Sequence, residues 1–276
     1  MEARLQRRVQ RYGWNRAAEY YDVWLSRLAP ATRGVLERAA VRPGERVLDV
    51  ACGTGALSLA AARSAGASGL VVGTDLSEKM VEAVRTAAEA MSLSICRFQH
   101  ADAEELPDFG IEFDVALCGL GLMYVPDPER AVRAMAARLR PGGRLAVSVW
   151  GPRERCGWAE IFPIVDARVK SDVCPLFFRL GTGDALRRAL EEAALADIAI
   201  DRIDATCSFD SAQQACDAAF LGGPVALAYA RFDDATRGLV RDQYLRSIAP
   251  FRRGAGYEIP GEFVIGYGVK GVAAAG

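Results

Sequence analysis

The nine-residue run VLDVACGTG, from Val47 to Gly55, restricts the fold of this chain more than any other segment. Its first residues suit a short buried strand, a glycine turn follows, and a helical pattern begins near Ala56. A strand that ends in such a turn brings backbone N–H groups and a helix N-terminus beside a ligand. Gly53 and Gly55 leave room there because neither has a Cβ. The run therefore predicts a ligand-binding strand–turn–helix unit in a parallel α/β sheet.

Two acidic residues end neighbouring strands of this pattern. Asp49 precedes the glycine turn, and Asp75 follows the next apolar run, 20 residues after Gly55. That is about the spacing at which a carboxylate meets a ribose diol in nucleotide-binding βαβ units. Asp49 suits a cationic or amino group better than a phosphate. The two carboxylates together predict a ligand that carries a ribose and an amino group.

Five segments resemble the class I S-adenosylmethionine-dependent methyltransferases, and most of all their small-molecule, ubiquinone-biosynthesis-like branch (type 11). VLDVACGTG and VVGTDLSEKM match the first two strand ends of that family, and QHADAEELP, FDVA and LRPGGRL follow in the family's order. The resemblance covers residues 10–150 well and the rest in outline. It implies S-adenosyl-L-methionine as cofactor and S-adenosyl-L-homocysteine as product. It also implies a Rossmann-like, seven-stranded, mostly parallel sheet in the order 3-2-1-4-5-7-6, with the last strand antiparallel, helices on both faces and a helical lid.

Alternating apolar and helical patterns predict the same organisation. The chain, 1–276, is expected to form one domain because no linker-like stretch interrupts it. Its expected parts are a helical cofactor cover at 1–40, broken at Gly13 and Pro30, a cofactor-binding core at 41–150, and acceptor-lid insertions at 151–182 and 207–256. Core strands are expected near 45–50, 69–74, 94–99, 113–118 and 143–150, core helices near 56–66, 77–91 and 128–138, and later a helix at 183–193 and strands at 196–206 and 262–270.

The resemblance assigns cofactor contacts to the strand ends and to the cover. Asp49 would hold the methionyl amino group, and Asp75 would accept from both ribose hydroxyls, since a carboxylate offers two acceptor oxygens. Leu76 and Met80 would pack against the adenine, whose amino group would donate to Asp102. The remaining implied contacts are Ala51, Gly53, Gly55, Ala103, Cys118, Gly119, Tyr21 and Trp14. Structural alternatives stay open for these residues: turn acceptor for Asp49, helix cap for Asp102 and packed core for the apolar side chains.

The loop 120–127 departs from the family, which has two adjacent histidines where this chain has Met123 and Tyr124. Histidine-assisted deprotonation of an acceptor is therefore not expected there. Tyr124 either orients the acceptor or packs beneath the lid. The lone histidine, His100, is expected to be structural or exposed on the adenine side. One histidine cannot build a multi-histidine metal site, so no metal is expected.

These features predict in-line methyl transfer to a small aromatic or apolar molecule, with oxygen or carbon favoured as the methylated atom and nitrogen as a further option. The alternative is a non-catalytic sensor or partner subunit that binds the cofactor or its product. A nicotinamide oxidoreductase is disfavoured because Ser58 replaces the third glycine of that fingerprint. Aromatic residues of the later segments indicate either an apolar acceptor pocket or ordinary core: Trp150, Trp158, Phe162, Phe177, Phe178, Phe220 and Tyr229.

Charge and cysteine usage bear on partners and compartment. The net charge of −1 gives no reason to expect a nucleic-acid partner. The basic stretch Arg4–Arg11 is expected to be a solvated helix face or a weak anion contact. Seven scattered cysteines without Cys-x-x-Cys spacing fit a reducing cytoplasm. We expect a monomer or homodimer without membrane association, because no long apolar run is present.

Overall fold

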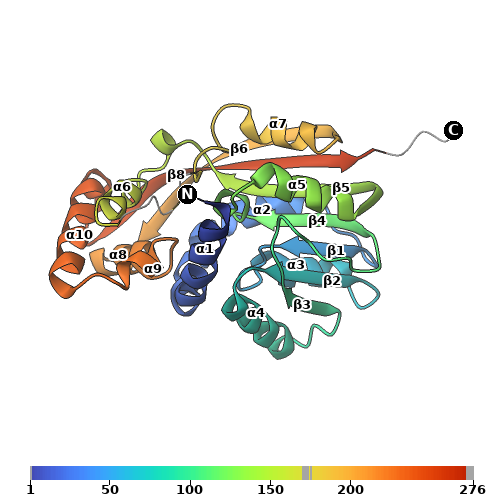
Figure 1. Cartoon of the computed structure of the whole chain (residues 1–276), viewed down its shortest axis with the longest axis horizontal. Coiled ribbons are helices and arrows are strands. Elements are labelled where there is room, and N and C mark those ends of the chain that lie inside the picture. Colours follow the sequence, from blue (N-terminus) through green and yellow to red (C-terminus); the bar gives the residue numbers. More distant parts are fainter. Residues whose placement is uncertain (1, 170–173, 175, 272–276) are drawn as a thin grey trace.

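The apolar runs of the sequence form the central strands of the structure, a computed structural model that describes residues 2–169, 174 and 176–271 (Figure 1). Val47, Leu48 and Val50 are fully buried because helices cover both faces of the sheet. The five parallel strands are β1 (Arg46–Val50), β2 (Leu70–Asp75), β3 (Cys96–His100), β4 (Phe113–Gly119) and β5 (Leu139–Trp150).

The strand order is β3-β2-β1-β4-β5-β8-β6. β8 (Gly256–Lys270) lies between β5 and β6 (Leu195–Phe209) and runs antiparallel to both. The two-residue β7 (Arg252–Arg253) pairs with β8 off this path and makes the sheet eight-stranded. The expected order 3-2-1-4-5-7-6 is confirmed, since β8 takes the place of the seventh long strand.

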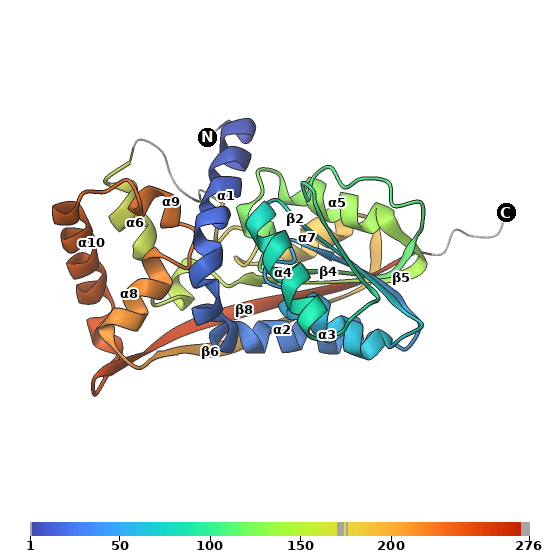
Figure 2. The ribbon, with the colours of Figure 1, turned by 90° about the horizontal axis from the view of Figure 1, so that it is seen from below.

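Helices cover the sheet in two layers (Figure 2). α2 (Leu25–Ala39) and α3 (Ala56–Ala65) pack against each other and against the sheet, and α4 (Glu78–Ala90) packs on β2 and β3. α5 (Pro128–Arg138) and α7 (Ala185–Glu192) form the opposite layer. Ser77 caps α4 and Asp127 caps α5, each accepting a backbone N–H of the first helical turn.

The strands β6 and β8 reach well beyond the rest of the sheet. β5 pairs with β8 between Phe263 and Val269, whereas β6 follows β8 as far as the pair Phe209–Tyr257. Four helices gather around this extension: α6 (Ile161–Asp166), α8 (Ala212–Phe220), α9 (Ala226–Tyr229) and α10 (Asp234–Ser247) (Figures 1 and 2). Short 3-10 turns join them to the sheet: η3 (Arg153–Arg155) and η4 (Ala249–Phe251).

The extension moves the boundaries expected from sequence. The expected strands at 196–206 and 262–270 are too short; in β6 the cause is charged residues that interrupt the apolar pattern on which its bounds rest. Residues 207–209 and 252–256 of the expected lid insertion include parts of β6, β7 and β8. β5 likewise begins at Leu139, which pairs with Phe113 before the register shifts. Within the expected insertion 151–182, residues 170–173 and 175 lie outside the described residues, as do 1 and 272–276 of the expected domain.

The N-terminal region is helical, but its breaks differ from the expected ones. α1 (Ala3–Ala17) runs through Gly13, α2 runs through Pro30, and the interruption is the 3-10 segment η1 (Ala18–Trp24). Gly13 faces α9, where an added Cβ would lie 3.8 Å from Leu227. Pro30 forfeits one backbone hydrogen bond, and burial of neighbouring residues such as Ala31 and Val35 keeps the helix intact.

Candidate active site

The turn after β1 is fastened to the end of β2. Ala51, Gly53 and Gly55 all have positive φ values, of 57°, 54° and 98°. The N–H of Cys52 donates to the carbonyl of Thr74, and the N–H of Gly53 donates to Asp75 Oδ2, both at 2.9 Å. The Gly53 N–H, expected beside a ligand, is thus already bonded to Asp75. Gly55 is the N-cap residue of α3 and lines no cavity described below, so its role here is the turn itself.

Asp75 has acceptor capacity left after these contacts. Its Oδ1 accepts the N–H of Ser77 at 2.8 Å, and its Oδ2 accepts that of Gly53. A carboxylate oxygen has two lone pairs, so each oxygen can still accept one hydroxyl hydrogen. Burial raises the pKa of Asp75, while these hydrogen bonds oppose that shift. Asp75 is therefore placed as an acceptor for two neighbouring hydroxyl groups.

Asp49 is a buried carboxyl group with an unused oxygen. One oxygen, Oδ2, accepts the hydroxyl of Ser58, whereas Oδ1 has no hydrogen-bond partner within the described residues. Burial raises the pKa of Asp49 to about 7, and the nearby Asp75 adds to the shift. The hydroxyls of Thr54 and Ser148 are also buried and unpartnered within the described part of the chain. Buried polar atoms are normally satisfied, so these three indicate a polar ligand group.

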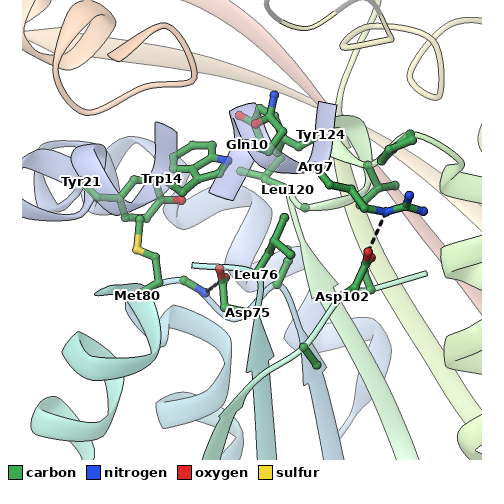
Figure 3. A pocket seen from close by; sticks show the side chains of 18 residues that line it. Arg7, Gln10, Trp14, Tyr21, Asp75, Leu76, Met80, Asp102, Leu120 and Tyr124 are labelled. Carbon is green, nitrogen blue, oxygen red and sulfur yellow. Dashed lines mark hydrogen bonds and ion pairs between the residues drawn. The ribbon is translucent and has the colours of Figure 1, made fainter. Parts of the chain in front are cut away.

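Three cavities meet at the carboxyl ends of β1, β2 and β4. The first, of about 720 Å³, contains Asp75, Met80 and Asp102 in its wall (Figure 3). The second, of about 490 Å³, contains Asp49, Thr54 and Ser148. The third, of about 400 Å³, is walled mainly by aromatic side chains.

Tyr21 and Leu120 line all three cavities. Tyr21 comes from η1 above the sheet, and Leu120 follows directly after β4. Leu120 has a φ of 57°, a conformation that is unusual for a non-glycine residue and concentrates at functional sites. Burial raises the pKa of Tyr21 to about 12. A ligand extending through the first two cavities would meet a molecule in the third beside these two side chains.

α1 crosses the first cavity and is fixed there by ion pairs. Arg7 Nε lies 2.7 Å from Asp102 Oδ2, and Arg7 Nη2 lies 2.6 Å from Glu104 Oε2. Further along the helix, Arg11 Nε donates to Glu78 Oε2 at 3.1 Å. Arg4 and Arg8 are exposed, as expected for a solvated face, whereas Arg7 and Arg11 form ion pairs with carboxylates that follow β3 or begin α4. The i, i+4 spacing of these arginines was the available signal.

The third cavity has aromatic walls joined by edge-to-face contacts. The ring of Tyr124 lies 4.9 Å from that of Trp14 and 5.5 Å from that of Phe177, centroid to centroid. Trp158 also packs 5.5 Å from Phe177, and its indole N–H has no hydrogen-bond partner within the described residues. Of the aromatic residues expected to form an acceptor pocket, this cavity contains Trp150, Trp158 and Phe177, whereas Phe162, Phe178, Phe220 and Tyr229 do not line it.

The structure brings most of the expected site residues together. The first cavity is lined by Ala51, Gly53, Asp75, Leu76, Met80, Asp102, Ala103, Gly119, Trp14, Tyr21 and Tyr124. Asp102 has a partner that the sequence did not reveal, since Arg7 occupies one oxygen and the N–H of Glu104 the other. Cys118 lines none of the three cavities; burial raises its thiol pKa to about 12. Arg7 and Gln10 line the first cavity and were missed.

Three further observations concern possible metal ligands, the lone histidine and membrane-spanning helices. Over residues 2–169, 174 and 176–271, no group of three or more His, Cys, Asp or Glu side chains could hold a metal ion. His100 is 43% exposed, and its Nε2 lies 3.9 Å from Glu78 Oε1, away from the aromatic cavity. None of the helices in the described ranges is long and apolar enough to span a membrane.

Comparisons with known proteins agree with this geometry. Residues 47–143 match the family model described as a methyltransferase domain. A demethylmenaquinone methyltransferase of Bacillus cereus is 38% identical over 105 residues, which is 38% of this chain and 44% of the relative; the chain thus spans less than half of that relative's length. A putative methyltransferase of Bacillus halodurans superposes with a TM-score of 0.61 over 90% of this chain and all of that one, at 20% identity. The [4+2]-cyclase SpnF superposes with a TM-score of 0.56 at 25% identity, covering 88% and 80% of the two chains.

The matched residues include the turn after β1, Asp75 and the strand end at Gly119, around which the three cavities meet. Residues 47–143 therefore form a methyltransferase domain, and the sheet around it has the strand order expected from the resemblance to the class I S-adenosylmethionine-dependent methyltransferases.

Proposed function

We propose that this protein transfers a methyl group from S-adenosyl-L-methionine to a small-molecule acceptor. The observation that carries the proposal is the meeting of two cavities that contain buried carboxyl groups and one aromatic cavity at Tyr21 and Leu120. A cofactor in the first two cavities would direct its reactive end toward the third. The acceptor would then approach from the aromatic side.

The residues present fit this cofactor group by group. The unpartnered Oδ1 of Asp49 suits an ammonium group, and the free lone pairs of Asp75 suit the two ribose hydroxyls. Leu76 and Met80 provide apolar contacts for the adenine in the first cavity. Asp102 could accept a hydrogen bond from the adenine amino group only with the lone pairs that Arg7 leaves free.

The chain's own contribution to the reaction is orientation and exclusion of water. S-adenosyl-L-methionine supplies an electrophilic methyl group on a sulfonium sulfur. Positioning two reactants in line can contribute roughly 7–11 kcal/mol toward the barrier. Tyr21 and Leu120 bound the point of transfer, and α1 closes the cavity from above (Figure 3). Tyr124, which lines both the first and the third cavity, would contact the acceptor.

The likeness to a [4+2]-cyclase favours a second candidate function. That protein shares the fold of this chain, and its name describes a cyclisation instead of a methyl transfer. This chain would then bind the cofactor or its product without consuming it, as a sensor, a partner subunit or a scaffold for another reaction. The two functions differ in turnover of the cofactor, not in its binding.

The setting proposed for this activity is the cytoplasm, with the protein as a monomer or homodimer and without a nucleic-acid partner. All seven cysteines are free thiols, which suits a reducing compartment. The net charge of −1 supplies no basic surface for a polyanion.

Transfer of labelled methyl from S-adenosyl-L-methionine into pooled phenols, quinols, enols, amines and thiols tests the proposal. We expect label in one pool, and its loss in the Asp75→Asn variant, which preserves side-chain shape but weakens the diol contact. Calorimetric titration with S-adenosyl-L-homocysteine should show binding to the parent protein. Absence of cofactor binding would refute both candidate functions, whereas binding without label in any pool would favour the second.

A further inference from the structure

We infer that the acceptor is a flat aromatic hydroxyl compound that ionises by itself in water and is held as an anion against the positive charge of the cofactor. This inference rests on the proposed function. It identifies the class of acceptor from the aromatic walls of the third cavity and from the lack of a base among the described residues of those walls.

The walls select a flat ring. Trp14, Tyr124, Phe177 and Trp158 form a continuous series of edge-to-face contacts, with centroid separations of 4.9 to 5.5 Å. The segment Gly222-Gly223-Pro224 also lines this cavity. Offset or edge-on packing against the aromatic walls favours an aromatic ligand.

No described residue that lines the third cavity carries a charge. Its titratable groups are the phenols of Tyr21 and Tyr124, and burial raises the pKa of both. Each therefore stays protonated near neutral pH and cannot serve as a base. An acceptor hydroxyl in this cavity has no carboxylate, imidazole or amine among the described lining residues to take its proton.

The charged groups of the neighbouring cavities are either bound to other residues or, in the proposed function, occupied by the cofactor. In the first cavity, Asp75 accepts two backbone N–H groups, and Asp102 pairs with Arg7. In the second, Asp49 accepts from Ser58 and has its other oxygen placed for an ammonium group. The acceptor proton therefore leaves to water before binding.

The transfer step then balances without a base. A lone pair of the acceptor oxygen forms the new O–C bond, while the carbon–sulfur bond breaks and its electron pair stays on sulfur. One negative and one positive charge disappear, and two neutral products result. Because the described walls supply no cation, the counter-charge for the bound anion is the sulfonium itself. Anion binding should therefore depend on the charge of the cofactor, since opposite charges attract strongly where water is excluded.

4-Nitrophenol is a suitable probe because its anion is coloured, and 4-nitroanisole is its matched neutral control. Each is titrated into protein saturated with sinefungin, which carries an ammonium group at the reactive position, or with neutral S-adenosyl-L-homocysteine. We expect the 4-nitrophenolate anion to bind at least tenfold more tightly to the sinefungin complex, with the colour of the anion retained. 4-Nitroanisole should bind the two complexes equally.

A second phenol of different acidity, 4-cyanophenol, shows which group titrates. The pH midpoint of binding should follow the phenol, and Tyr124→Phe should leave that midpoint unchanged. A midpoint at the same pH for both phenols would overturn the inference by revealing a titrating group of the protein. Binding of the neutral phenol, or no saturable binding of either probe to the sinefungin complex, would also overturn it. Cofactor binding measured alone by calorimetry separates these outcomes from failure of the proposed function.

Discussion

Proton release on cofactor binding follows from the state of Asp49. Its carboxyl group is 1% exposed, and burial raises its pKa to about 7 despite the hydrogen bond from Ser58. An ammonium group beside the unpartnered Oδ1 would favour the ionised form and lower that pKa again. Binding of S-adenosyl-L-homocysteine, which carries this ammonium group, should therefore release a proton wherever free Asp49 is protonated.

The magnitude follows from a pKa of about 7 for the free protein. Asp49 is then about 90% protonated at pH 6 and about 10% at pH 8, so binding should release roughly 0.9 and 0.1 protons. Each pH unit below 7 costs close to a factor of ten in affinity. Between pH 7.5 and pH 5.5 the dissociation constant should rise roughly 25-fold, about 1.9 kcal/mol.

Isothermal calorimetry in buffers of different ionisation enthalpy measures the released protons directly. Asp49→Asn cannot titrate and should bind without proton release, with an affinity that is flat between pH 5.5 and 7.5. Asp114→Asn is the matched control, because Asp114 lies at the opposite end of the neighbouring strand, bound to Arg140 and the N–H of Arg46. Proton release that persists in Asp49→Asn, or that is absent from the parent protein at pH 6, would refute this reasoning.

Three further outcomes are expected from buried charges and glycines. Because the folded-state pKa of Asp49 is raised, the free protein should lose stability as the pH rises from about 4 to 7, by up to ~4 kcal/mol, and urea unfolding of Asp49→Asn should lack that slope. Arg7→Met should destabilise the protein by about 2–3 kcal/mol and speed amide exchange in α1, because it leaves the buried carboxylate of Glu104 unpaired; unchanged exchange would argue against the ion pair as a clasp. Gly55→Ala should lower the thermal midpoint more than Gly110→Ala, since both have positive φ but only the first would collide with Val84; equal shifts would contradict this.

The central fold could be predicted because each strand of the core is a short apolar run that ends in turn residues. Val47–Val50 and Leu70–Thr74 are such runs, and their burial on both faces leaves little freedom of register. β6 was harder to bound because it is an edge strand whose charged side chains, such as Arg202 and Asp204, face solvent and ion-pair partners. Sequence periodicity reveals a strand through its buried face, and an edge strand has a smaller buried face than a central one.

The cofactor side of the site was predictable for a related reason: its residues follow strands directly, and parallel strands end at one edge. The acceptor side was not, because it is assembled from distant segments. Trp14, Tyr124, Phe177 and the 222–224 turn are separated by tens to hundreds of residues and meet only through the packing of η1, α8 and α9. The ion pairs of Arg7 could not be predicted for a similar reason, because a basic helix has the same sequence pattern whether water or a carboxylate faces it.

Two residues at the junction of the cavities have side chains although their backbone conformation is one that favours glycine. Ala51 and Leu120 follow the adjacent strands β1 and β4, and both have a φ of 57°, which glycine would adopt without strain. Each such residue costs about 1–2 kcal/mol relative to a relaxed conformation. Glycine at position 120 would relieve that strain and remove the side chain that borders all three cavities. Leu120, whose N–H donates to the carbonyl of Ser148 at 2.9 Å, therefore closes the junction at the cost of that strain.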